Sequence, residues 1–259
     1  MGSRALPQGG CRRERVNRAT PDAAGALWCP SANVGDRRGG ALPDIIVLHF
    51  TAMATAEAAL ERLCDESPPE GLFPVSCHYL IAEDGRLWQL VPEARRAWHA
   101  GAGAWGDVED VNSRSIGIEL ANPGDTPFAA PQMARLEALL GGIMQRWSIP
   151  PERVIGHSDM APVRKVDPGP KFDWRRLALQ GLSVWPEPGD VAGEDGAGED
   201  GTFFSDLARF GYRHPEGVSE EALLAAFRMR FRPWATAAES PADRAVARAL
   251  ARRYPVLRG

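Results

Sequence analysis

Residues 44–50 have the sequence Asp44-Ile-Ile-Val-Leu-His-Phe50, a continuous apolar run rich in β-branched side chains. Such a run is typical of a strand that is buried on both faces of a sheet. His49 lies near the carboxyl end of this predicted strand. Because ligand sites of open α/β sheets gather where the strands end, His49 is the first candidate for chemistry.

Strand-like and helix-like segments alternate along the chain outward from this run. Residues 78–82 and 86–91 flank Asp84-Gly85 and predict a hairpin, and residues 115–121 and 153–156 predict two more strands. Residues 54–66 and 131–147 have apolar side chains at three- and four-residue intervals, which predicts helices. The alternation predicts an α/β fold, with a central mixed β-sheet flanked by helices.

The C-terminal segment has a different pattern. Phe203–Phe210, the run after Ser219 and the run after Ser240 predict a small three-helix C-terminal module. Residues 185–201 hold six acidic residues, no basic residue and repeated Gly and Pro, so we expect a flexible linker there. The predicted organisation is a basic, mostly irregular N-terminal arm (1–40), a catalytic domain (41–184), the linker (185–201) and the helical module (202–259).

Composition excludes several classes of protein. The 259 residues are 44% hydrophobic and 25% charged with a net charge of −4, so we expect a folded protein that does not bind nucleic acid. The sequence contains no run of eighteen apolar residues, so we do not expect a membrane span. Residues 1–25 have no apolar run of signal-peptide length, which favours the cytoplasm if the chain starts at its true start, with the cell envelope as the alternative.

Two further residues could join His49 in a metal site. His157 follows Gly156 at the end of another predicted strand, and Asp167 lies in the turn Lys165-Val-Asp-Pro-Gly169. Two imidazoles and one carboxylate form a three-ligand Zn²⁺ site that leaves a fourth position open for water. The alternative is that each histidine is a hydrogen-bonded core or turn residue.

Several motifs occur in one order and together carry a family resemblance: Val47-Leu-His-Phe-Thr-Ala52, Cys77-His-Tyr-Leu-Ile81, Ala97-Trp-His-Ala-Gly101, Ser115-Ile-Gly-Ile-Glu-Leu120, Gly156-His-Ser-Asp-Met-Ala-Pro162 and Lys165-Val-Asp-Pro-Gly-Pro170. Over residues 41–180 the chain resembles the zinc-dependent N-acetylmuramoyl-L-alanine amidases of the amidase_2 type, which are related to phage T7 lysozyme and to peptidoglycan recognition proteins. Residues 203–255 resemble the peptidoglycan-binding module of AmiD-like members.

The resemblance implies roles for particular residues. It assigns His49, His157 and Asp167 as the zinc ligands, Glu119 as the base that acts on the attacking water, and Lys165 as the group that stabilises the tetrahedral intermediate. The family often has Tyr at position 50, where this chain has Phe, so a hydrogen bond from that hydroxyl is lost.

The chemistry of amide hydrolysis agrees with these roles. The reaction needs an activated water, a carboxylate that accepts its proton and a cation for the developing oxyanion. Burial of Glu119 on its strand would raise its pKa toward a usable value, whereas a solvent-facing Glu119 would have no such role.

Four residues are weaker candidates for substrate binding. His99 and Trp98 belong to the Trp-His-Ala-Gly motif, His78 has a structural role as its alternative, and Asn122 follows the strand of Glu119 and otherwise satisfies a turn. The sequence therefore predicts an amidase that cleaves between N-acetylmuramic acid and L-alanine in peptidoglycan or muropeptides. The alternatives are a non-catalytic peptidoglycan recognition protein and a zinc peptidase that cuts within the stem peptide.

Overall fold

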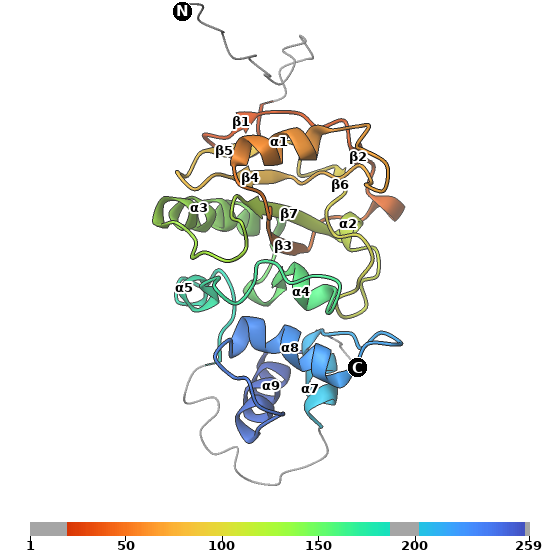
Figure 1. Ribbon diagram of the computed structural model, residues 1–259, viewed down its shortest axis with the longest axis vertical. Helices are drawn as coiled ribbons and strands as arrows, with labels where there is room; N and C mark the ends of the chain where they lie inside the picture. Colours follow the sequence, from red (N-terminus) through yellow and green to blue (C-terminus); the bar gives the residue numbers. More distant parts are fainter. Residues whose placement is uncertain (1–19, 187–201, 257–259) are drawn as a thin grey trace, which may run out of the picture.

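A computed structural model describes residues 20–186 and 202–256 of the chain (Figure 1). Its centre is a sheet with the strand order β1-β5-β4-β7-β3-β8, in which β4 and β5 run antiparallel and the other neighbours run parallel. The mixed sheet confirms the predicted fold class. The strands are β1 (Leu27–Trp28), β2 (Val34–Gly35), β3 (Ile45–Phe50), β4 (Tyr79–Ile81), β5 (Leu87–Gln89), β6 (Arg96–Ala97), β7 (Ser115–Leu120) and β8 (Val154–Gly156), with β2 and β6 paired apart from the main sheet.

Local sequence signals explain where four of the helices begin. The hydroxyls of Thr55, Thr202, Ser219 and Ser240 each accept a hydrogen bond from a backbone N–H in the first turn of the helix that follows. The helices are α1 (Ala56–Cys64), α2 (Val111–Arg114), α3 (Ala130–Trp147), α4 (His157–Met160), α5 (Trp174–Ala178), α7 (Phe203–Phe210), α8 (Glu220–Phe231) and α9 (Pro241–Arg253), with 3-10 turns η1 (Arg38–Gly40) and η2 (Pro151–Arg153).

The side chains of β3 alternate between two buried clusters. Ile46 and Leu48 pack on one face of the sheet in a cluster that includes α3 and α5. Ile45 and Val47 point to the other face, where they belong to one cluster with aromatic residues of the C-terminal helices such as Phe227. Figure 1 shows α8 next to α4 and α5. The C-terminal helices therefore share buried core with the sheet and its connecting segments.

The ends of the predicted segments lie partly outside the described residues. Most of the predicted linker, residues 187–201, and residues 1–19 of the predicted arm are not described, and the boundaries of the four predicted segments stay predictions. Residues 20–40 contribute β1 to the edge of the sheet and a buried Arg37, which donates hydrogen bonds to the backbone oxygens of Ser115 and Glu93. Within residues 20–186 and 202–256 no helix is long and apolar enough to cross a membrane.

Candidate metal centre and active site

The sheet brings the predicted site residues to one edge. In the parallel pair β3 and β7, His49 lies beside Glu119, and in the pair β3 and β8, Leu48 lies beside Gly156. His157 begins α4 directly after β8, so its side chain lies at the same strand ends. Asp167 lies on the loop that follows α4. The backbone oxygen of Asp167 accepts a hydrogen bond of 2.9 Å from the N–H of Ser158.

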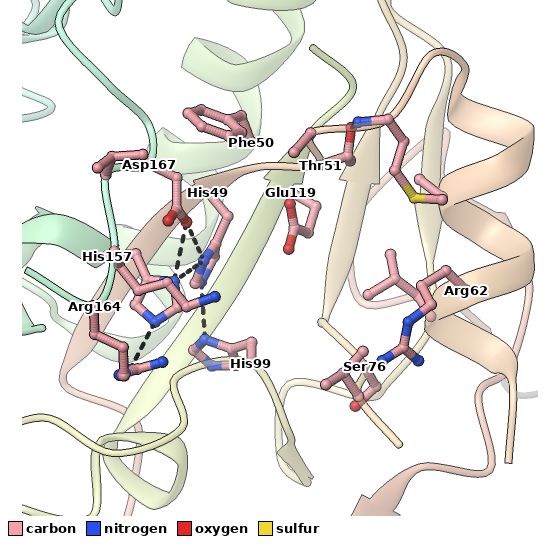
Figure 2. Close-up of a pocket in the computed structure, with 17 residues that line it drawn as sticks. His49, Phe50, Thr51, Arg62, Ser76, His99, Glu119, His157, Arg164 and Asp167 are labelled. Atoms are coloured by element: carbon pink, nitrogen blue, oxygen red, sulfur yellow. Dashed lines mark hydrogen bonds and ion pairs between the residues drawn. The ribbon is translucent and has the colours of Figure 1, made fainter. Parts of the chain in front are cut away.

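Three buried atoms that could bind a metal ion lie close together, one each from His49, His157 and Asp167 (Figure 2). His49 Nδ1 lies 2.9 Å from His157 Nδ1 and 2.9 Å from Asp167 Oδ2, and His157 Nδ1 lies 3.0 Å from the same carboxylate oxygen. The structure thus brings together the three residues that the sequence predicted to converge.

Hydrogen bonds to the far side of each imidazole determine which ring nitrogen is free. His157 Nε2 lies 2.9 Å from the carbonyl oxygen of Ala100, which can only accept, so the proton of neutral His157 is on Nε2 and Nδ1 has a lone pair. Burial is the main cause that lowers the pKa of His49 to about 4, so the His49 ring is neutral at pH 7.

A relay of two more side chains fixes the tautomer of His49. The Ser115 hydroxyl donates to Val111 O at 2.6 Å, so it accepts from His99 Nε2–H at 3.1 Å. His99 Nδ1 then accepts from His49 Nε2–H at 3.0 Å, which leaves His49 Nδ1 without a proton. Partners of this kind orient metal-binding histidines in proteins.

The donor set fits a cation. The two imidazole nitrogens that carry no proton and the carboxylate oxygen are all hydrogen-bond acceptors. A single proton therefore cannot form a hydrogen bond in all three of their contacts. Imidazole and carboxylate are ligands of Zn²⁺, and three protein ligands with one open position are typical of catalytic zinc. The structure therefore provides a suitable zinc site.

Glu119 faces the same cavity without a partner. Its Oε2 atom is shielded from solvent and has no hydrogen bond within the described residues. The pKa of Glu119 is raised to about 8, mainly by burial and also by the nearby Asp167, against the opposing effect of Lys165. An unpartnered carboxylate beside a metal site has the features of a proton acceptor.

The cavity around these groups has a volume of about 410 Å³, which suits a small-molecule ligand. The metal triad, Glu119 and Lys165 line one side. Side chains of α1 and of the segment after it line the other side, as Figure 2 shows for Arg62 and Ser76. Phe50, which replaces the expected Tyr, also lines the cavity, and its ring fills the space beside Gly124.

The four weaker substrate candidates separate clearly. His99 lines the cavity, but Trp98, His78 and Asn122 do not. His78 is fully buried, with Nδ1 accepting from Gly117 N–H and Nε2 near Arg95 O, and burial lowers its pKa to about 3. Asn122 accepts from Gly124 N–H and donates to Thr126 O. Their placement favours the structural alternatives for His78 and Asn122.

Two arginines that the sequence did not single out also line the cavity. Arg164 donates to the backbone oxygens of Ala100 and Ala102, so it shares its Ala100 acceptor with His157. Arg62 donates to Phe73 O at 2.7 Å. Neither had a sequence signal, because the chain has many arginines and only the fold shows which of them reach the site.

Comparison with known families decides the identity of this fold and site. The family model for N-acetylmuramoyl-L-alanine amidase, Amidase_2, matches residues 39–170, about half of the chain. The chain belongs to the Amidase_2 family. The match includes the whole metal triad, which is typical of the zinc-binding Amidase_2 enzymes, so zinc is the cofactor that this site is built to hold.

Several Amidase_2 relatives cover most of the chain. AmiD of Escherichia coli K12 is 37% identical over 236 residues, which cover 81% of this chain and 83% of AmiD. The solved complex of E. coli AmiD with anhydro-N-acetylmuramic acid-L-Ala-D-gamma-Glu-L-Lys is 33% identical with a TM-score of 0.72, covering 86% of this chain and 98% of that one. AmpDh3 of Pseudomonas aeruginosa in complex with anhydromuramic pentapeptide is 30% identical with a TM-score of 0.73, covering 87% and 96%.

Proposed function

We propose that this protein is a zinc-dependent N-acetylmuramoyl-L-alanine amidase that acts on muropeptides, including 1,6-anhydro forms. The observation that carries the proposal is the juxtaposition of three bare zinc ligands with the unpartnered Glu119 in one cavity of an Amidase_2 fold. Two relatives that cover nearly the whole chain have been solved with anhydro-muropeptides, which supports this class of substrate. Intact peptidoglycan is the larger substrate that we propose alongside it.

His49, His157 and Asp167 would hold the metal, whose Lewis-acid chemistry would lower the pKa of a water to about 7. Glu119 accepts the proton of the attacking water. Its pKa of about 8 falls when positive charge lies beside it, so the carboxylate is available as a base near neutral pH. Glu119 then returns the proton to the L-alanine amine as the amide C–N bond breaks, because a neutral amine is the better leaving group.

Lys165 is the cation that we propose for the oxyanion of the tetrahedral intermediate. It lines the cavity on the loop between His157 and Asp167, and its side chain is only partly exposed. An ammonium that lines the cavity can stabilise the charge that develops on the substrate oxygen. His99 has a second role beside the orientation of His49, since its ring lines the substrate cavity.

Hydrolysis in H₂¹⁸O tests the proposed bond. The substrate is 1,6-anhydro-N-acetylmuramyl peptide, and the products are separated and weighed by mass spectrometry. An amidase places one ¹⁸O in the lactyl carboxylate of the sugar and releases an unlabelled peptide that begins with L-alanine. Label in the carboxylate of a fragment that still joins the sugar to part of the peptide would identify a peptidase, and substrate binding without any labelled product would identify a recognition protein.

A further inference from the structure

One arginine of the C-terminal helices is buried against the segment that bears His157. Arg230 on α8 is 2% exposed. Its Nη1 donates to Asp159 Oδ2 at 2.7 Å, and its Nη2 donates to Val154 O at 3.0 Å. The plane of the guanidinium lies over the Trp174 ring, 4.3 Å from its centre. Arg230 thus contacts β8, α4 and α5 from outside the region that the family model matches.

Asp159, the partner of Arg230, fixes the backbone of the residue that precedes the metal ligand His157. Asp159 is fully buried, and the Oδ2 atom that Arg230 contacts also accepts from Gly156 N–H at 2.8 Å. Its Oδ1 atom accepts from the hydroxyl of Tyr212, which follows α7. Since Gly156 directly precedes His157, the carboxylate of Asp159 fixes the turn from β8 into α4, and two groups of the C-terminal helical region fix the carboxylate.

The same turn is packed against the second loop of the metal site. A Cβ atom on Gly156 would lie 2.9 Å from Pro168 Cδ and 3.3 Å from the Trp174 ring, so this contact has no spare room. Pro168 follows Asp167, whose backbone oxygen accepts from Ser158. A shift of the Gly156 turn therefore moves His157 and Asp167 together.

We propose that Arg230 is a positioning residue for the metal centre, so that the C-terminal helices form part of the scaffold of the zinc site. The inference rests on the proposed metal ligands and deepens the proposed function. Without Arg230, Asp159 keeps a buried charge that lacks its main counter-ion, and the carboxylate must move toward water and release Gly156. The expected loss is precision of the His157 position rather than loss of the fold.

The test compares two buried arginines of one helix in the full-length protein. Arg230→Met removes the contact with Asp159 but retains an apolar stem over Trp174. Arg228→Met is the matched control, since Arg228 is also buried and its partners, Asp243, Ala237 and Ala238, all lie within the C-terminal region. Zinc affinity is measured by competition with a chromophoric chelator, and the Co²⁺-substituted proteins are compared by visible absorption.

We expect Arg230→Met to weaken zinc binding about 10-fold, to shift the Co²⁺ spectrum and to lower kcat with little change in KM. We expect Arg228→Met to lower the melting temperature but to leave zinc affinity within about 2-fold. Equal zinc affinity in wild type and Arg230→Met, or equal weakening in both variants, would overturn the proposal.

A milder variant covers the case in which Arg230→Met fails to fold. Tyr212→Phe removes only the hydroxyl that Asp159 accepts, and we expect about a 3-fold loss of zinc affinity; unchanged affinity would again overturn the proposal. Wild-type protein that binds zinc but cleaves no muropeptide would refute the proposed function without affecting this test. Wild-type protein that binds no zinc would refute the metal site itself.

Discussion

Replacing Glu119 by Gln should stabilise the metal-free protein while it removes activity. Burial raises the pKa of Glu119 from 4.5 to about 8, so at pH 7 the carboxyl is protonated in the folded protein and ionised in the unfolded chain. Linkage then gives a folding penalty of roughly 3 kcal/mol at pH 7. We reduce it to about 2 kcal/mol because part of the side chain faces the cavity. The Glu119→Gln variant has no such penalty, because an amide does not ionise.

The assay is thermal and urea unfolding of zinc-stripped protein across pH 4 to 8. Glu119 by itself should lower the stability of the wild type as pH rises from 4.5 toward 8, since its raised pKa favours the folded state only in acid. The lowered pKa values of His49 and His78 act in the opposite direction, so the Glu119 contribution is measured as the difference between wild type and Glu119→Gln at each pH. Glu119→Gln should remove that contribution and raise the melting temperature by roughly 4–8 °C at pH 7. In the zinc-loaded enzyme the same variant should lower kcat/KM by about 10²- to 10⁴-fold.

A second buried carboxylate provides a control of opposite sign. Glu93 accepts hydrogen bonds from Tyr79, Arg146 and Trp147. Burial raises its pKa, but these bonds outweigh burial and hold the pKa below its usual range. Glu93→Gln should therefore lower the free energy of unfolding at pH 7 by about 3 kcal/mol. Equal destabilisation by both variants would refute the reasoning about Glu119.

Three further substitutions have distinct expected results. His99→Leu should weaken zinc binding about 10-fold in a chelator competition, because it removes the acceptor that fixes the His49 tautomer; unchanged affinity would exclude the relay. Lys165→Met should lower kcat about 10²-fold with KM nearly constant in steady-state kinetics, and a change confined to KM would assign Lys165 to substrate binding. Asp243→Asn should lower the free energy of unfolding by about 3 kcal/mol at pH 7, measured by urea unfolding. Burial raises the pKa of Asp243, but the bonds to Arg228 and Ser240 outweigh burial and hold the pKa well below its usual range. The loss should therefore shrink progressively as pH falls below about 4.

Much of the fold could be predicted because local signals and periodicity agree. The apolar run of β3, the Asp84-Gly85 turn between β4 and β5, and the capping hydroxyl of Ser240 each fix an element with short-range information. The two-residue strands β1, β2 and β6 could not be predicted, since they are defined by partners far away in the chain. The shared core of the sheet and the C-terminal helices is likewise a long-range property.

The site divides in the same way. Strand ends and a rigid turn indicate His49, His157 and Asp167, whereas Glu119 is indicated by the family resemblance, with which its position on a buried strand agrees. The sequence indicates both His78 and His99 as candidates, with a structural role as the alternative for His78, but short-range context does not show which ring faces a cavity. Only the close approach of the His99 ring to Gly117 and the burial of His78 against Arg37 show which of them faces the cavity.

The most direct test of the central claim is a zinc titration of stripped protein, scored by release of the L-alanine stem peptide from anhydro-muropeptide. The account predicts no release without metal and a rate that rises linearly to saturation at one zinc per chain. His157→Ala should show neither tight binding nor release. Full release of the stem peptide by completely zinc-free protein would contradict the account.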